Sequence, residues 1–144
     1  KPSPLSDAFT QDYFLGLFAG LEKDDPRSVK YFMISKPGVL GMGNGCLQDI
    51  LWQARLHPRR PAIGLSRTEQ QRLYAATRES LRKMVEGGGR DGDYDLYDQP
   101  GRYRRILHSK AVGQPCPHCR VPIEKASYLG GAVYFCPQCQ ASTA

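Results

Sequence analysis

Cys116-Pro-His-Cys119 and Cys136-Pro-Gln-Cys139 are two Cys-x-x-Cys pairs near the end of the chain, with sixteen residues between the inner cysteines. In this spacing each pair sits on a tight turn and offers two sulfurs to one tetrahedral ion. The pattern therefore predicts one structural zinc ion bound by four cysteines. Two disulfides, an iron ion in the same geometry, or a coincidental spacing are the alternatives.

The segment between the two pairs indicates a β-hairpin. A short run of strand-forming residues, Val-Tyr-Phe, precedes Cys136, and Gly130-Gly131 before it predicts the turn. Two arms this short cannot bury a core, so the bound metal is expected to supply most of their folding free energy.

The composition allows one modest core beside this metal-held unit, since the chain has 144 residues of which 40% are apolar. No apolar run approaches the roughly twenty residues that cross a bilayer, and the first residues lack a signal-peptide stretch. The pattern assigns four of the five cysteines to a metal, which is consistent with a reducing compartment. The fifth, Cys46, is expected to be packed. We expect a monomer in the cytosol or nucleoid, with no membrane partner.

The net charge of +6 is modest, but the basic residues are clustered. One cluster surrounds His57 and the other lies within residues 102–110. Such clusters indicate a polyanion partner, usually nucleic acid. A solvated basic surface is the alternative.

Apolar residues recur at helical spacing in four segments between residues 9 and 85. Asp25 is the predicted N-cap of the second helix and Asn44 that of the third, while Ser66 and Glu69 form a capping box for the fourth. The glycines of Gly41-Met-Gly-Asn44 allow a sharp turn whose exposed amides suit a phosphate. Residues 90–114 are a long polar segment, which is typical of a functional or mobile loop.

In this order, the helices, the Gly-x-Gly-Asn turn and the four-cysteine hairpin resemble the C-terminal half of the formamidopyrimidine-DNA glycosylase / endonuclease VIII family of base-excision repair enzymes. The resemblance covers the chain from about Leu5. The matching residues are Lys30 with Met33-Ile34, Gly41-Met-Gly-Asn44, His57-Pro, Pro115-Cys-Pro-x-Cys119 and Cys136-Pro-x-Cys-Gln140.

The resemblance implies a mainly α fold with a small β-hairpin. Residues 1–6 would be an inter-domain linker. Residues 7–110, including the loop 87–110, would form a helix-two-turns-helix bundle, and residues 111–144 a four-cysteine zinc-finger hairpin.

By the same resemblance, the chain is the DNA-binding portion of a DNA glycosylase/AP lyase that grips damaged or abasic double-stranded DNA through its phosphates. Lys30 and the Asn44 side chain would contact backbone oxygens, assisted by the amides of Gly41 and Gly43. On the hairpin, where this chain lacks a phosphate-binding arginine of the family, Lys125 or Tyr128 would partly replace it. Such contacts position an enzyme without specifying sequence.

Three positions depart from the family pattern. Ser35-Lys36 replaces an Asp-Gln pair, and Gly131 stands where family hairpins often carry a phosphate-binding arginine. The nucleophile of the family is an N-terminal proline followed by glutamate, whereas Pro2 lies between Lys1 and Ser3. We therefore expect no catalytic residue in this chain and assign catalysis to the other half of a longer parent enzyme.

Two alternatives belong to other functional classes. One is a non-enzymatic zinc-ribbon protein that binds nucleic acid in transcription or on the ribosome, and the other is an iron carrier of rubredoxin type. Residues 90–103 correspond to the lesion-capping loop of the family, with Tyr97 and Tyr103 as stacking candidates; a surface loop with packed tyrosines is the alternative. His57, His118 and Trp52 are expected to be structural.

Overall fold

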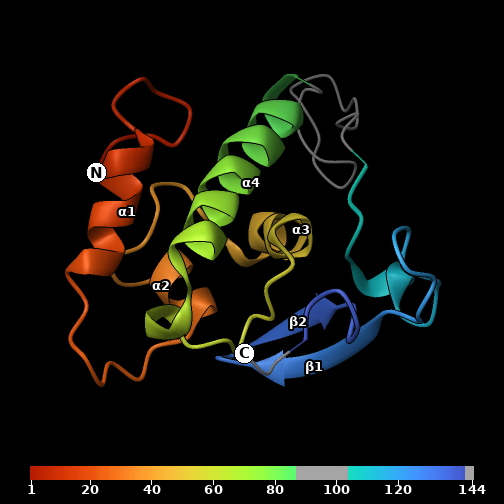
Figure 1. Ribbon diagram of the computed structural model, residues 1–144. Coiled ribbons are helices and arrows are strands. Elements are labelled where there is room, and N and C mark those ends of the chain that lie inside the picture. Colours follow the sequence, from red (N-terminus) through yellow and green to blue (C-terminus); the bar gives the residue numbers. More distant parts are fainter. Residues whose placement is uncertain (87–103, 142–144) are drawn as a thin grey trace.

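The computed structural model describes residues 1–86 and 104–141. Four α-helices are followed by a two-stranded hairpin (Figure 1), as the sequence predicts. The elements in chain order are α1 (Gln11–Ala19), α2 (Val29–Ile34), α3 (Asn44–Ala54), η1 (Ala62–Gly64), α4 (Arg67–Glu86), η2 (Ser109–Ala111), β1 (Glu124–Tyr128) and β2 (Gly131–Phe135).

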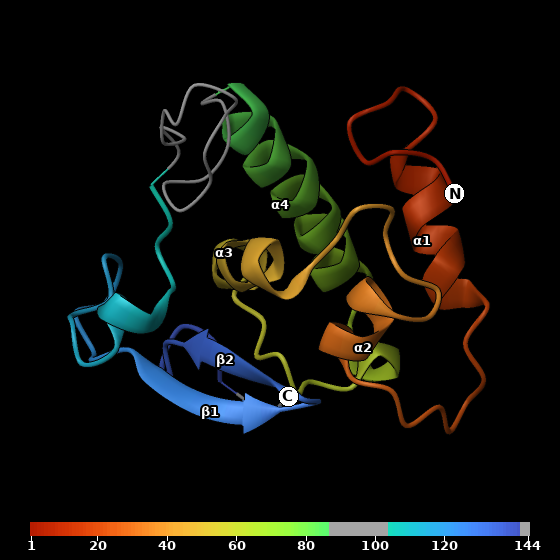
Figure 2. The ribbon, with the colours of Figure 1, turned by 180° about the vertical axis from the view of Figure 1, so that it is seen from behind.

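Helix α3 is the central element. It packs against α4 on one side and against β2 on the other, while α1 and α2 contact α4 and α3 respectively. The two opposite views of the ribbon place α3 between the long α4 and the hairpin (Figures 1 and 2). The hairpin is therefore docked on the helices rather than extended from them.

Aromatic rings fill the core of the helical part. Phe18 of α1 stacks on Phe32 of α2 with ring centroids 4.2 Å apart, and Phe14 meets Phe32 edge-on at 6.4 Å. Phe9 stacks on Tyr74 of α4 at 5.7 Å. These contacts join α1 to α2, and the segment before α1 to α4, where each helix alone would bury too little apolar surface.

Helix α4 begins at the predicted capping box. The Glu69 amide donates to Ser66 Oγ (3.1 Å), and the Ser66 amide donates to Glu69 Oε1 (2.9 Å). Arg60 donates to both Glu69 oxygens, and this hydrogen bonding lowers the pKa of Glu69. At 20 residues α4 is the longest helix, and no helix in the described ranges is long and apolar enough to cross a membrane.

The predicted cap of the second helix is wrong. Helix α2 begins at Val29, and its N-cap is Ser28, whose Oγ accepts from the Tyr31 amide at 3.2 Å. The Asp25 carboxylate instead accepts from the backbone amide and the Nε of Arg27 at 3.0 and 2.8 Å. A local side-chain turn thus competes with helix capping at Asp25.

The predicted cap of the third helix is also wrong by one residue. Gly43 is the N-cap of α3, and Asn44 is the first helical residue. The Asn44 side chain turns away from its own helix and donates to the carbonyl oxygen of Ala132 at 2.9 Å. The Asn44 side chain, which local propensity predicts as the helix cap, is therefore engaged in a tertiary hydrogen bond instead.

The hairpin turn lies one residue earlier than predicted. Leu129 and Gly130, with φ of 52° and 77°, are the two turn residues, and Gly131 pairs with Tyr128 as the first residue of β2. A two-residue turn with both φ values positive matches the right-handed twist of a hairpin. The register beyond the turn pairs Ser127 with Ala132 and Lys125 with Tyr134.

The substitution Phe32→Ala tests the aromatic core. Because Phe32 is fully buried and contacts two other rings, its loss should lower the free energy of unfolding by about 3–5 kcal/mol. Val85→Ala is the control, since Val85 is 62% exposed and should change stability by less than about 0.5 kcal/mol. Urea denaturation measures both, and similar values for the two variants would contradict the packing described.

Candidate metal centre and nucleic-acid interface

The four predicted cysteines form one cluster. Their sulfur atoms all lie within 4.8 Å of one another, with Sγ–Sγ distances of 3.9 Å for Cys116–Cys139 and 3.3 Å for Cys119–Cys136. A tetrahedral ion with bonds of about 2.3 Å holds its sulfurs about 3.8 Å apart, whereas a disulfide needs about 2.0 Å. The site can therefore hold one tetrahedral metal ion, and the donor set fits a soft or borderline cation.

Hydrogen bonds to the sulfur of Cys116 favour its thiolate form. Burial alone would raise the pKa of Cys116, but N–H donors, including the His118 amide and the Trp52 indole at 3.4 Å each, outweigh it and lower the pKa to about 6. Burial and the neighbouring thiols raise the pKa of Cys136 and of Cys139. A bound dication reverses this second effect, because it favours all four thiolates.

One stripe of α3 carries the contacts between the helices and the hairpin. Asn44, Gln48 and Trp52 are spaced four residues apart and so lie on one helix face. Asn44 donates to Ala132 O, Gln48 pairs with the same strand, and Trp52 Nε1 donates to Cys116 Sγ. Trp52 also packs against the second hydrophobic cluster, which is built around Leu107 and Cys116. The structural role expected for Trp52 is thus confirmed.

Gln48 acts as a short strand partner for β2. Its Nε2 donates to Ala132 O at 2.9 Å, and its Oε1 accepts from the Tyr134 amide at 3.1 Å. Ser127 and Ala132 are the pair next to the residues that close the turn, so their peptide groups point away from the partner strand. Gln48, which is only 5% exposed, satisfies this outer edge of the hairpin with both atoms of its amide.

Two further tethers fix the ends of the metal-binding unit. The Gln140 amide group donates to Leu56 O at 3.0 Å and accepts from the Cys136 amide at 2.9 Å. The buried carboxylate of Asp49, also on α3, accepts from the amides of Ile106 and Leu107. The chain is therefore attached to α3 before the hairpin, and to Leu56, just beyond the end of α3, after it.

Lys30 and Asn44 meet at the tip of the hairpin. Lys30 Nζ donates to Tyr128 O at 2.6 Å, close to the Ala132 carbonyl that Asn44 holds. Burial lowers the pKa of Lys30. The two side chains line a groove of about 430 Å³, which we call the tip groove. Its lining residues are Lys30, Tyr31, Ile34, Ser35, Asn44, Leu129, Gly130 and Gly131.

Gly131 lines the tip groove beside Lys30 and Asn44. A Cβ atom at this position would lie 3.4 Å from Asn44 Nδ2 and 3.6 Å from Lys30 Nζ. The Asn44 amide and the Lys30 ammonium thus lie beside the hairpin backbone at Gly131, which has no side chain. The position at which family hairpins often carry an arginine is therefore in direct contact with the two side chains singled out for phosphate binding.

The other candidate residues lie around this groove at different distances. The Tyr128 ring has Lys30 Nζ 5.8 Å from its centroid. Gly41 and Gly43 are exposed in the turn before α3. Lys125 is exposed on β1 opposite Tyr134, three residues before Tyr128, and does not line the groove.

His57 and His118 make structural contacts, as expected. His57 is buried against Phe135, with ring centroids 4.5 Å apart, and its Nδ1 accepts from the Arg59 amide. Burial and then the charge of Arg59 lower the pKa of His57. His118 Nε2 lies 2.9 Å from Arg55 Nη1, outside the sulfur cluster. Cys46 packs against the helical core.

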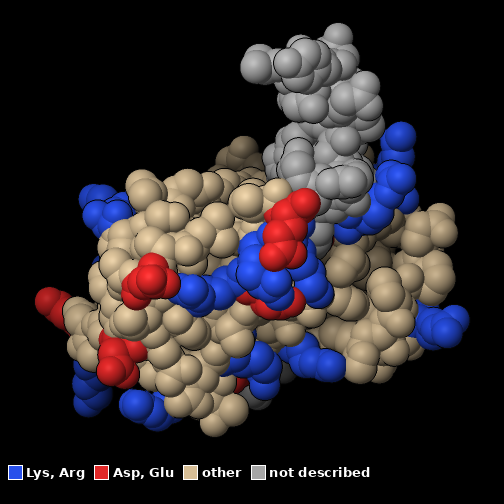
Figure 3. Space-filling model, turned by 90° about the horizontal axis from the view of Figure 1, so that it is seen from above, with Lys and Arg blue, Asp and Glu red and all other residues tan. Residues whose placement is uncertain are grey.

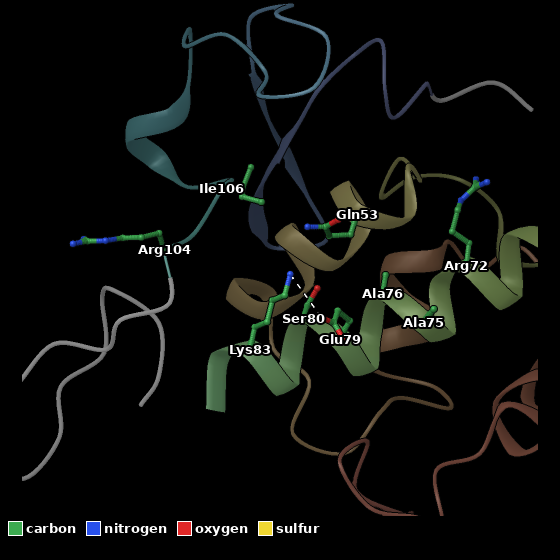
Figure 4. A pocket seen from close by; sticks show the side chains of 9 residues that line it. All are labelled: Gln53, Arg72, Ala75, Ala76, Glu79, Ser80, Lys83, Arg104 and Ile106. Atoms are coloured by element: carbon green, nitrogen blue, oxygen red, sulfur yellow. Dashed lines mark ion pairs between the residues drawn. The ribbon is translucent and has the colours of Figure 1, made fainter. Parts of the chain in front are cut away.

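A second cavity, of about 350 Å³, lies between α4 and the segment of Arg104 and Ile106 (Figure 4). Its basic side chains do not converge: Arg104 points away from the cavity, Arg72 Nε donates to Ala54 O at 2.8 Å, and Lys83 pairs with Glu79 at 3.7 Å. On the face shown in Figure 3, acidic and basic side chains are interspersed. Neither feature forms a single anion site. Residues 90–103, the candidate lesion-capping loop with Tyr97 and Tyr103, lie outside the described ranges.

Metal removal should be visible in Trp52, the one tryptophan of the sequence. Stripping the metal with a chelator should loosen the hairpin and expose the indole, which shifts its fluorescence emission to longer wavelength. Cys139→Ser should bind metal more weakly by at least tenfold, because one of four ligands is lost. Cys46→Ser is the matched control and should retain one ion per chain by elemental analysis. Equal metal content in the unmodified protein, Cys139→Ser and Cys46→Ser would contradict the four-cysteine site.

The sequence matches the family model described as "Formamidopyrimidine-DNA glycosylase H2TH domain" over residues 1–93. The formamidopyrimidine-DNA glycosylase of Thermus thermophilus is 38% identical over 145 residues, which cover 96% of this chain and 52% of that protein. A crystal structure of the MutM (Fpg) protein from Thermus thermophilus superimposes with a TM-score of 0.84 at 34% identity, over 99% of this chain and 54% of that one.

A complex of Lactococcus lactis Fpg with DNA containing an abasic site has the same fold, with a TM-score of 0.81 at 23% identity, over 96% of this chain and 50% of that one. The chain thus spans about half the length of the relatives it matches. The helix order, the Gly-x-Gly-Asn turn and the docked four-cysteine hairpin agree with these comparisons: the chain belongs to the formamidopyrimidine-DNA glycosylase family and corresponds to its C-terminal half.

Proposed function

We propose that this chain is the DNA-binding half of a base-excision-repair DNA glycosylase/AP lyase and that the tip groove grips the backbone of damaged or abasic duplex DNA. The observation that carries the proposal is the meeting of Lys30 and Asn44, which lie on different helices, at the tip of the hairpin. A cation and an amide held side by side are suited to one phosphate group.

Both side chains keep hydrogen-bond donors for a phosphate. Lys30 has three N–H donors and uses one on Tyr128 O; the Asn44 amide has two and uses one on Ala132 O. The hairpin carbonyls hold each group in place while the remaining donors face the groove. Little side-chain entropy is then lost when a phosphate binds.

The start of α3 adds backbone donors. Its N-cap is Gly43, and no side chain caps the first turn. The amides of this turn and the helix dipole favour a negative group. We assign Gly41 and Gly43 the role of letting a phosphate approach these amides, and Lys125 and Tyr128 the role of contacts on the hairpin side.

Zinc is the metal that fits this proposal best. Four thiolates in a closed, half-buried tetrahedron are typical of structural zinc, with no position open for water or substrate. In this role the ion maintains the hairpin, and the hairpin carbonyls position Lys30 and Asn44. The chain's own residues would bind and orient DNA, while base removal would require the other half of the parent enzyme.

We also propose that the chain acts as a monomer in the bacterial cytosol and divides into a linker (1–6), a helical DNA-binding unit (7–110) and a zinc hairpin (111–144). Two separate clusters of buried side chains support a division into helical and hairpin parts. Leu107, which these bounds assign to the helical unit, packs in the second cluster.

Lys30→Gln and Asn44→Ala test the grip. Each should weaken binding to a duplex with a central abasic-site analogue by roughly tenfold, because a charged phosphate loses one direct hydrogen-bond partner. Lys30→Gln should also reduce the slope of log affinity against log salt by about 0.9, whereas Asn44→Ala should leave it unchanged, since the amide is neutral. Fluorescence anisotropy at several salt concentrations measures both quantities.

Lys83→Gln is the matched control, because it removes an equal charge from α4 on the exposed face. It should bind as the unmodified protein does. Competition between duplex DNA and double-stranded RNA distinguishes the proposed function from the zinc-ribbon alternative, because A-form grooves present the backbone differently. Salt-independent binding, or preference for RNA, would refute the proposal.

A further inference from the structure

Arg59 is a basic residue that the proposed grip does not use. Its guanidinium lies 4.3 Å from the centroid of the Tyr128 ring, and its Nη2 donates to Ser127 O at 3.0 Å. This carbonyl is on the outer edge of β1, opposite the edge of β2 that α3 holds. Arg59 is exposed, so it covers the hairpin from the solvent side.

Backbone contacts tie Arg59 to the same place as Lys30. The Lys30 amide donates to Pro58 O and the Val29 amide to Arg60 O, so the segment carrying Arg59 runs along the start of α2. The Arg59 amide donates to the buried His57 ring at 3.0 Å. These bonds fix the position of the arginine backbone, and the stacking on Tyr128 orients its side chain.

Two positive charges therefore share one tyrosine ring. Lys30 Nζ is 5.8 Å and Arg59 Cζ 4.3 Å from the Tyr128 centroid. In the described part of the chain neither group forms an ion pair with a carboxylate, and the nearby Asp25 is paired with Arg27 at 2.8 Å. Two positive charges on one ring, neither of them paired with a carboxylate, favour the binding of an anion beside that ring.

We propose that Arg59 is a further DNA-backbone contact, which together with Lys30 binds phosphate at the Tyr128 side of the hairpin tip. A guanidinium has five N–H donors, and the structure engages one of them on a carbonyl. The remaining planar edge suits two phosphate oxygens. This inference rests on the proposed DNA binding and extends the tip groove to the outer edge of β1.

Arg59→Gln should weaken binding to the abasic-site duplex by roughly tenfold and lower the salt slope by about 0.9. Arg82→Gln is the control, since it removes an exposed arginine from α4 and should change neither value. Arg59→Lys should retain the slope, because the charge remains, and recover part of the affinity. Metal content and Trp52 emission should be unchanged in all three variants.

The salt slope separates phosphate binding from a purely structural strap across the hairpin. Tyr128→Leu, which removes the stacking platform and keeps the charge, should lower the affinity with little change of slope. If Arg59→Gln leaves the slope intact while Lys30→Gln reduces it, the Arg59 contact is refuted and the proposed function stands. If neither variant changes binding or slope, the proposed function itself fails.

Discussion

The pairing of Gln48 with the outer edge of β2 is the contact on which this arrangement depends. A hairpin of two five-residue strands exposes unpaired peptide groups on both edges and buries little apolar surface. Gln48 satisfies one such edge with a donor and an acceptor from the middle of α3. The metal site and the helices thereby become one body rather than two units joined by a chain.

The geometry of α3 explains why one helix can serve both ends of this body. Residues four apart are about 6 Å apart along the axis, so Asn44, Gln48 and Trp52 follow the length of the hairpin from its tip to its metal ligands. Asn44 holds the carbonyl of Ala132 near the turn, and Trp52 reaches the sulfur of Cys116.

Much of this structure follows from local chemistry and is predictable from the sequence. The cysteine spacing, the Ser66–Glu69 capping box and the helical periodicities are each confirmed. The errors at helix starts have two causes: the neighbouring Arg27 engages Asp25, whereas a distant group engages Asn44. Asn44 has the propensity of a cap, but its partner Ala132 is 88 residues away. By its residue type, Gln48 looks like an ordinary solvent-facing helix residue. Its position four residues after Asn44 is the one sequence feature that places it on the same helix face. The sequence predicts the hairpin turn at Gly130 and Gly131, because glycine adopts positive φ easily, but Leu129 rather than Gly131 is the second residue with positive φ.

Hydrogen exchange with and without an abasic-site duplex tests most directly the claim that helix and hairpin form one DNA-binding surface. The metal-loaded protein should gain protection in two segments at once, residues 41–48 before and in α3 and residues 127–134 around the hairpin tip, with little change in α4. Protection confined to one of these segments, or appearing mainly on α4, would contradict the account.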